Sequence, residues 1–353
     1  MRRIAHAAAL TTSLLAVPCG FAVPAVAAPA VVVSVKPVHS LAAAVMQGVA
    51  TPSLLLEAGQ SPHTYSLTPS QAAMLERADL VVWVGPALES FLARPVRNIA
   101  VPDASFPLIR LDGLSVLQAR EGGAWAGHDP MHGAGSDADH GHGHEHALEP
   151  GDGVAQGRDS QPTHTGDTIP GETIQGMPAD TVDPHVWLDP SNAKRIVDAL
   201  AQRLRQIDPD NAAAYRANAK AAIERIDALD AELEQTLRPV RSVPYVVFHD
   251  AYHYFENHFG TNAVGSITLS PDRKPGAQRL AEIRRKITEL DARCVFREPQ
   301  FAPDLVQTVV ENTDATVATL DPLGVDHPAG PDAYPQMMRD LGASLRACLS
   351  PKS

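Results

Sequence analysis

Short apolar runs alternate with amphipathic segments along most of the chain. In the N-terminal part, apolar runs of strand length occur at 31–35, 52–56, 80–84 and 108–111. Between them, apolar residues recur at helical spacing at 41–50 and 70–78. Short continuous apolar runs are typical of strands buried on both faces, so the alternation predicts a parallel sheet covered by helices.

The same alternation resumes in the C-terminal part of the chain. We expect strands at 244–248, 262–267, 294–296 and 316–320. We expect helices at 252–258, 276–290, 303–311 and 334–349. This pattern predicts a second α/β unit with a parallel-type sheet flanked by helices.

Two helices lie between these parts. Apolar spacing predicts a helix at 196–207 and, after Pro209, a longer helix from about 211 to 238. At about 1.5 Å per residue the longer helix extends roughly 40 Å, enough to cross a whole domain face. The sequence therefore predicts an α/β protein with lobes at 28–207 and 241–353, joined by one long rigid helix within 208–240.

The first residues have the features of an export signal. A basic start precedes an apolar run at 4–17, which is too short to form a permanent transmembrane helix. The small residues Ala25-Val26-Ala27 offer a cleavage point, so we expect a signal peptide at 1–27 and an exported protein. Pro18 precedes Cys19 where a lipoprotein signal has a small residue, which disfavours lipidation.

Export changes the interpretation of the cysteines. Cys294 and Cys348 are the two that remain after residue 27. An even number of cysteines in an oxidising compartment predicts a disulfide between them, with two buried thiols as the alternative.

The composition limits the choice of ligand. Of 353 residues, 44% are hydrophobic, which suffices for buried cores. The chain carries 29 lysines and arginines against 41 aspartates and glutamates, a formal charge of -12. This balance argues against nucleic acid as a partner.

From 113 to 182 the α/β alternation stops. This stretch is rich in glycine, proline, aspartate and histidine, so it lacks the apolar residues to pack a core and predicts a flexible loop. Seven of the 15 histidines lie in it: His128, His132, His140, His142, His144, His146 and His164. Such a run can bind a cation weakly in many arrangements, or it can be a solvated polar linker.

Four residues outside this loop have the placement of a ligand-binding site. Ligands of open α/β sheets collect beyond the carboxyl ends of strands. His63, His249 and Asp321 follow predicted strands, and His185 lies in a segment bracketed by prolines. Three imidazoles and one carboxylate suit a tetrahedral zinc site. Because these residues come from both lobes, the metal would lie in the inter-lobe cleft; taken singly, each histidine can instead have a capping or supporting role.

His39 also follows a predicted strand. We expect it to start a helix or to line the wall of the cleft rather than to bind metal.

Several motifs together carry a specific resemblance. They are Val32 to Pro37, Ser61-Pro62-His63-Thr64-Tyr65, Asp183 to Pro190, Phe248-His249-Asp250-Ala251-Tyr252, Arg297-Glu298-Pro299-Gln300-Phe301 and Leu320-Asp321-Pro322-Leu323-Gly324. With them, nearly the whole mature chain resembles the periplasmic zinc-binding proteins of bacterial high-affinity zinc ABC importers.

The resemblance implies Zn2+ as the bound ion and His63, His185 and His249 as ligands. In that family the fourth position is taken by water or a carboxylate. Some zinc-binding members have a glutamate where Pro62 stands here. Asp321, whose counterpart binds metal in manganese-type relatives, is therefore our predicted fourth ligand in preference to water.

The resemblance also implies location and partners. It indicates a periplasmic solute-binding protein that captures Zn2+ and delivers it to a membrane permease driven by a separate ATPase. We expect a monomer without enzymatic activity. Relatives carry similar histidine-rich loops, which favours a weak zinc-collecting role for this one.

Three alternatives remain. A manganese or iron receptor of the same family would prefer more oxygen ligands, so three histidines favour zinc. A zinc-dependent hydrolase would need an open coordination position and a general base, and the chain has no His-Glu-x-x-His motif. A surface adhesin would need an adhesion module, and no segment suggests one.

Overall fold

The computed structural model describes residues 28–99, 104–120, 173–268 and 275–351. The predicted signal peptide at 1–27, including Cys19, lies outside the described residues. The seven histidines of the predicted metal-collecting loop also lie outside them, within 121–172. These predictions remain predictions.

The N-terminal sheet has four parallel strands. Their order is β2(Ser53–Leu54), β1(Val31–Val33), β3(Leu80–Trp83) and β4(Ser105–Pro107). The strand predicted at 108–111 is wrong, because these residues form the 3-10 turn η1(Leu108–Arg110). Leu108 and Ile109 are buried, which explains the apolar signal, but they are buried in a turn that follows β4.

Four helices accompany this sheet. They are α1(Lys36–Val45), α2(Pro69–Glu76), α3(Ser90–Ile99) and α4(Pro190–Ile207). α1 begins five residues before the predicted start at 41, with Pro37 in its first turn, where a missing N–H costs nothing. α2 begins with a capping box formed by Thr68 and Gln71. We did not predict α3, which contains Pro95, a residue that argues against a helix interior.

The C-terminal sheet also has four parallel strands. Their order is β10(Thr316–Thr319), β9(Cys294–Arg297), β7(Pro244–His249) and β8(Asn262–Thr268). Its helices are α6(His253–Phe259), α7(Ala277–Glu289), α8(Asp304–Val310) and α9(Ala333–Leu349). All eight elements lie within one residue of their predicted bounds.

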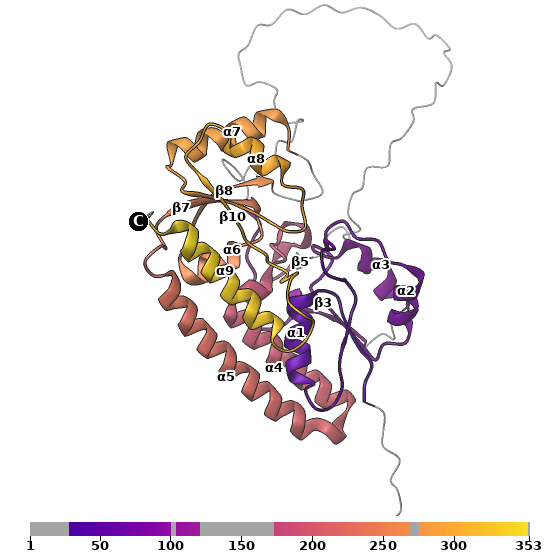
Figure 1. The fold of residues 1–353 in the computed structure, drawn as a ribbon. Helices are drawn as coiled ribbons and strands as arrows, with labels where there is room; N and C mark the ends of the chain where they lie inside the picture. Colours follow the sequence, from indigo (N-terminus) through magenta and orange to yellow (C-terminus); the bar gives the residue numbers. More distant parts are fainter. Residues whose placement is uncertain (1–27, 100–103, 121–172, 269–274, 352–353) are drawn as a thin grey trace, which may run out of the picture.

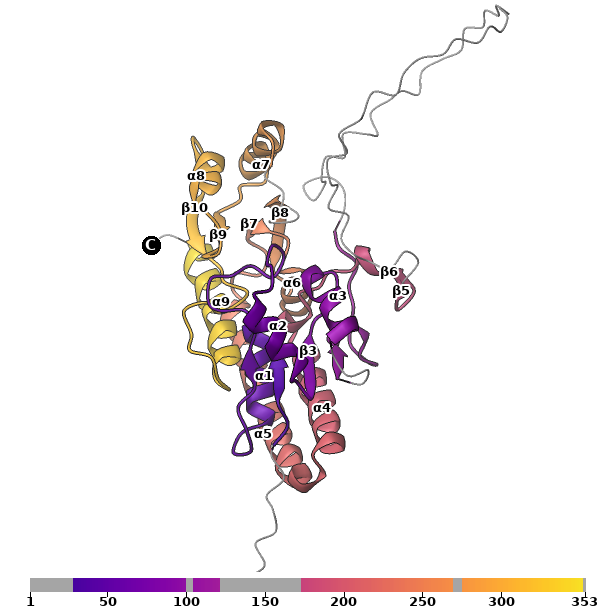
Figure 2. The same ribbon diagram turned by 90° about the vertical axis from the view of Figure 1, so that its right-hand side faces the viewer.

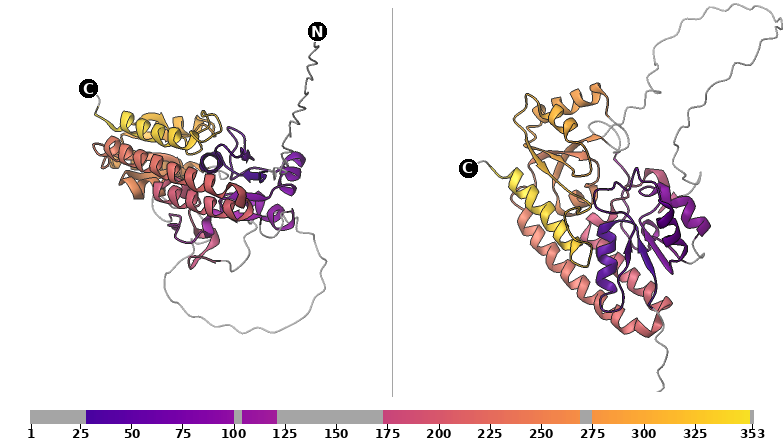
Figure 3. Two further views of the ribbon diagram at one scale, coloured as in Figure 1. Left: turned by 90° about the horizontal axis from the view of Figure 1, so that it is seen from below. Right: turned by 45° about the vertical axis from the view of Figure 1, so that its right-hand side comes forward.

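A helix of 26 residues, α5(Ala212–Leu237), follows the short turn η5(Pro209–Asn211) and runs along both lobes (Figure 1). It packs against α4, α1 and α9, and seen from below it lies beside α9 (Figure 3). The predicted α/β fold with two lobes joined by a long helix is confirmed. None of the helices in the described part of the chain is both long enough and apolar enough to cross a lipid bilayer.

One hydrophobic core runs through both lobes. Val33 of β1 and Val247 of β7 contribute to it, together with side chains of α1, α4, α5, α6 and α9. The alternate residues Val32 and Val246 point to separate outer cores, one in each lobe. Because successive strand residues face opposite sides of a sheet, each sheet contributes one face to the shared core. The lobes are therefore joined by packing as well as by α5.

The last helix also crosses between the lobes. The N-terminal end of α9 lies beside α1 (Figure 2). There the Tyr334 backbone N–H donates to Ser40 Oγ at 2.9 Å, and the Tyr334 hydroxyl donates to the Trp187 carbonyl at 3.1 Å. A segment that belongs to the C-terminal lobe in sequence therefore contacts the N-terminal lobe.

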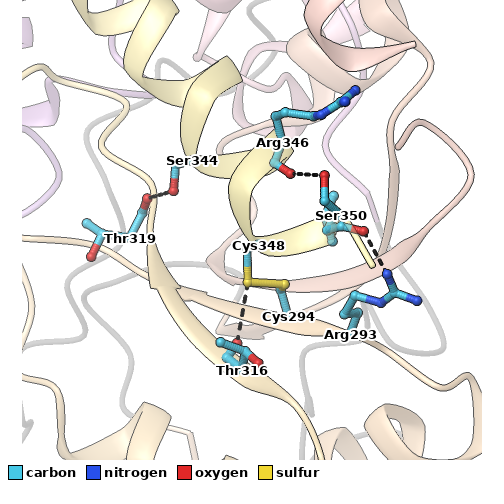
Figure 4. Close-up of a disulfide and its surroundings, with 9 residues drawn as sticks. Arg293, Cys294, Thr316, Thr319, Ser344, Arg346, Cys348 and Ser350 are labelled. Atoms are coloured by element: carbon cyan, nitrogen blue, oxygen red, sulfur yellow. Dashed lines mark hydrogen bonds between the residues drawn. A yellow bond between two sulfur atoms is a disulfide. The ribbon is translucent and has the colours of Figure 1, made fainter. Parts of the chain in front are cut away.

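The predicted disulfide between Cys294 and Cys348 is confirmed (Figure 4). Cys294 is the first residue of β9, and Cys348 lies in the last turn of α9. Nearby, the Ser344 hydroxyl donates to the Thr319 carbonyl (Figure 4). The C-terminal end of α9 is thus fastened to the sheet.

The range predicted for the flexible loop, 113–182, is too long, because described residues at both of its ends are structured. Residues 173–178 form the antiparallel pair β5(Thr173–Ile174) and β6(Met177–Pro178), and the turn η3(Ala179–Thr181) follows. Gln118 pairs with Val182 in a β-bridge. Leu114, Ile174 and Val182 are buried in the shared core, and their burial holds both ends of the insertion against the protein.

Candidate metal centre

Three predicted ligand residues converge at one point. His63, His185 and His249 each offer a ring nitrogen, and these atoms all lie within 4.8 Å of one another. The ring centroids are 5.5 Å apart for His63 and His185, 5.7 Å for His63 and His249, and 5.1 Å for His185 and His249. In the part of the chain that the structure describes, no other group of three such side chains has the spacing of a metal site.

The end of strand β7 positions His249. Its neighbour in the sheet, β9, ends at Arg297, so the next residue, Glu298, lies beside His249. Glu298 Oε1 accepts from His249 Nδ1 at 2.6 Å and from the His249 backbone N–H at 3.3 Å. An Nδ1–H held by a carboxylate leaves the Nε2 lone pair free for a metal.

A second carboxylate holds His185 in the same way. Asp183 Oδ1 accepts from His185 Nδ1 at 2.8 Å and from the His185 backbone N–H at 2.9 Å. Asp183 is 3% exposed and Glu298 is 1% exposed, so water does not compete for either bond. Burial raises the pKa of Asp183 to about 6, against the opposing effect of its bond from the His185 backbone.

The two oriented rings face each other. The Nε2 atoms of His185 and His249 lie 3.3 Å apart. When both rings carry their proton on Nδ1, neither Nε2 has a hydrogen to donate, and two lone pairs point into the same space. A proton or a metal cation placed there removes the repulsion. His63, on the loop after β2, adds a third imidazole at this point.

The protonation states favour metal binding. Burial, with smaller contributions from the neighbouring imidazoles, places the pKa of both His63 and His185 well below the usual value. Burial also lowers the pKa of His249, but Glu298 and nearby aspartates raise it by more, so the net pKa is raised. Two rings are therefore neutral ligands at neutral pH, and a proton competes with metal mainly at His249.

Asp321 is the predicted residue that the structure does not bring into this group. Its Oδ1 accepts from Gln300 Nε2 at 2.9 Å and from the Leu323 backbone N–H at 3.0 Å. Its Oδ2 accepts from the Val325 backbone N–H at 2.5 Å. Both oxygens are thus engaged near its own loop, and its role as a fourth ligand stays a prediction.

His39 lies in α1 and is 3% exposed. Its Nε2 is 2.9 Å from the Pro52 carbonyl oxygen. It thus supports the loop before β2 and lies outside the group of three imidazoles.

Sequence reasoning missed the two orienting carboxylates. Glu298 lies two residues beyond the strand predicted at 294–296, so the rule that selected His249 and Asp321 would have found it. Asp183 lies two residues before His185, and this proximity was the available signal.

A partly buried ion cluster lies next to the imidazoles. Arg120 binds Asp250, the residue after His249, and donates to Glu256 Oε2 at 2.6 Å. Arg120 is the last described residue before the insertion. The start of the insertion is therefore tied to the segment that carries His249.

Two α/β lobes joined by a long helix, with three imidazoles converging between them, define a helix-linked solute-binding receptor of the metal-binding class. The family model described as "ZnuA: Zinc-uptake complex component A periplasmic" matches residues 31–348. A relative named high-affinity zinc uptake system protein ZnuA, from Brucella suis biovar 1 (strain 1330), is 43% identical over 345 residues, covering 98% of each chain. The chain belongs to the ZnuA family.

Solved structures agree on the fold. A structure titled "Crystal structure of ZnuA" has a TM-score of 0.66 at 21% identity and covers 92% of this chain and 100% of its own. The periplasmic zinc binding protein TroA from Treponema pallidum has a TM-score of 0.68 at 17% identity and covers 92% of this chain and 99% of its own.

Proposed function

We propose that this protein captures Zn2+ in the periplasm and delivers it to an ABC permease for import. The observation that carries the proposal is the convergence of His63, His185 and His249, two of them oriented by buried carboxylates. Membership of the ZnuA family supports the proposed cargo, location and partners.

The proposed zinc ligands are these three imidazoles. Zn2+ suits nitrogen ligands in a tetrahedral arrangement, and a metal-binding histidine usually donates its other N–H to a carboxylate or carbonyl. The predicted fourth ligand is Asp321, with water as the alternative. Manganese and iron prefer more oxygen ligands, so a site with three nitrogen ligands supports zinc over these ions.

The proposed role needs no chemical transformation. Zinc is the cargo, and the chain holds it until a membrane permease accepts it. A separate ATPase would supply the energy, and we propose that the receptor acts as a monomer. The histidine-rich insertion is proposed to collect zinc weakly near the site.

Metal titration of the purified protein tests this function. After chelator stripping, the wild-type protein should take up one tight Zn2+ in a calorimetric competition with a chelator of known affinity. His249→Ala should lose this site, and the control Lys220→Ala, whose lysine side chain is 78% exposed on α5, should keep it. Equal zinc affinity of His249→Ala and the wild-type protein would refute the proposal, as would displacement of zinc by an equal concentration of Mn2+.

The insertion is tested separately. Replacing residues 121–172 by a short glycine and serine linker keeps both described ends of the insertion, including Arg120 and β5. We expect loss of weak zinc equivalents with the tight site retained. Loss of the tight site would contradict the proposed division of roles.

A further inference from the structure

The ammonium group of Lys36 links the two lobes through hydrogen bonds that do not involve the three imidazoles. Lys36 is the first residue of α1 and is 8% exposed. Its Nζ donates to the carbonyl oxygens of Gly324, Val325 and His327 at 2.9, 2.8 and 2.9 Å. An ammonium has three N–H donors, so these carbonyls satisfy all of them.

The segment that accepts these bonds is folded around Asp321. The Asp321 carboxylate accepts the backbone N–H groups of Leu323 and Val325 and the side-chain amide of Gln300. An aspartate that binds the backbone two residues ahead stabilises a turn. Asp321 therefore shapes segment 321–327, and this shape presents the carbonyls to Lys36.

Charge balance links Lys36 to the same segment. Burial lowers the pKa of Lys36, and the carboxylates of Asp321 and Asp326 act in the opposite direction. The positive charge of Lys36 is therefore favoured by two carboxylates of the segment that its ammonium group contacts.

Segment 321–327 also touches the part of the N-terminal lobe that carries a ligand. Trp187 Nε1 donates to the Pro322 carbonyl at 2.9 Å, and the Trp187 ring centroid lies 5.4 Å from that of His185. Gly324 has a φ of +63°, and a Cβ there would lie 3.1 Å from the Met337 Cβ. The segment therefore fits closely between α9 and the N-terminal lobe.

We propose that Lys36 clamps segment 321–327 onto the N-terminal lobe and that Asp321 belongs to this clamp rather than to the metal. Lys36 is then a positioning residue for the three imidazoles, and the fourth zinc position is left to water. This inference rests on the proposed zinc-binding function. It means that the lobes are already held in register before metal arrives.

Three variants test the clamp in the full chain: Lys36→Met, Asp321→Asn and the control Lys220→Met, whose lysine side chain is 78% exposed on α5. Hydrogen exchange of the metal-free proteins reports on the amides of Leu323 and Val325. Stopped-flow chelator competition gives the zinc dissociation rate. Absorption of the Co2+-loaded protein reports on coordination number and ligand type.

We expect Lys36→Met to increase exchange in 321–327 and to speed zinc dissociation about 10-fold, a size typical of residues that support metal ligands. Lys220→Met should match the wild-type protein. Asp321→Asn should increase the same exchange and leave the Co2+ spectrum unchanged. A changed Co2+ spectrum in Asp321→Asn, or unchanged exchange and dissociation in Lys36→Met, would overturn the clamp.

One measurement uses only the wild-type protein, so it does not depend on whether a variant folds. In the metal-free state, the amides of Leu323 and Val325 should be strongly protected, and exchange at free-peptide rates would refute the clamp. Wild-type protein without a tight zinc site would refute the proposed function instead. The exchange measurement would still decide the clamp, because it requires no metal.

Discussion

The Nε2 atoms of His185 and His249 lie 3.3 Å apart, although 64 positions, including the whole of α5, separate the two residues along the chain. Each ring is turned by a buried carboxylate at its Nδ1, Asp183 for one and Glu298 for the other. The site is therefore built in two layers, in which carboxylates orient imidazoles and the imidazoles face the cation. The following predictions test this arrangement and its support.

Glu298→Gln tests the orienting layer. A glutamine oxygen can still accept the Nδ1–H of His249, but it carries no charge and makes the imidazole a weaker ligand. We expect zinc affinity to fall roughly 10-fold, the lower end of the effect of such carboxylates. The matched control is Glu224→Gln, whose side chain is 64% exposed on α5. Chelator competition measures both, and equal affinities would argue against a role for Glu298.

The number of protons released by zinc tests the protonation states. The pKa of His249 is raised and those of His63 and His185 are lowered, so at neutral pH a proton competes with zinc only at His249. Zinc affinity should fall as pH falls through the pKa of His249, and more steeply once the other two rings protonate. Calorimetry in buffers of different ionisation enthalpy should show up to one proton released near neutrality. Release of two or three protons there would contradict this assignment.

His258 should stabilise the fold in a pH-dependent way. Its Nδ1 lies 3.0 Å from Asp189, which caps α4, and its Nε2 lies 2.8 Å from Asp230 on α5. The hydrogen bond to Asp189 is the largest contribution that raises the pKa of His258 to about 9, against the lowering effect of partial burial. A raised pKa stabilises the folded state fully below the unfolded pKa of about 6.5, and this stabilisation disappears as pH rises through about 9.

We therefore expect His258→Gln to lower the free energy of unfolding by about 2 kcal/mol at pH 6. By pH 10, where His258 is neutral, the difference in the free energy of unfolding between the variant and the wild-type protein should be smaller, because only neutral contacts of the imidazole are then lost. Urea unfolding at both pH values measures it. The control His327→Gln removes a pair with Asp340, whose side chain is 71% exposed, and should cost less than about 1 kcal/mol at either pH. A difference for His258→Gln that does not change with pH would exclude the ion pairs.

Removing the disulfide should lower stability without removing the metal site. Cys294 and Cys348 are separated by 54 residues, and closing a loop of that length is worth about 4 kcal/mol in the chain-entropy model. The double variant Cys294→Ser with Cys348→Ser should unfold at lower urea concentration and keep one zinc per chain. Dithiothreitol treatment of the wild-type protein should reproduce the effect. Unchanged stability would show that packing of α9 alone holds this end of the helix.

The sequence by itself determined the fold class and most of the elements. The C-terminal strands and helices were predictable to one residue because each is a short apolar run or an amphipathic repeat bounded by turns. The elements that failed have identifiable causes. Pro95 concealed α3, and Leu108 and Ile109 are buried in a turn rather than in a strand. In both cases tertiary packing overrode the local pattern.

The same division applies to the site. His63 and His249 were identifiable because residues beyond strand ends face the ligand crevice, and His185 because it lies in a specific motif bracketed by prolines. Their distances, the orienting bonds of Asp183 and Glu298, and the engagement of Asp321 with its own loop and Lys36 were decided only by the tertiary structure. The physical reason is that hydrogen bonds between distant segments depend on how two lobes pack, and the order of residues along the chain carries no direct record of that packing.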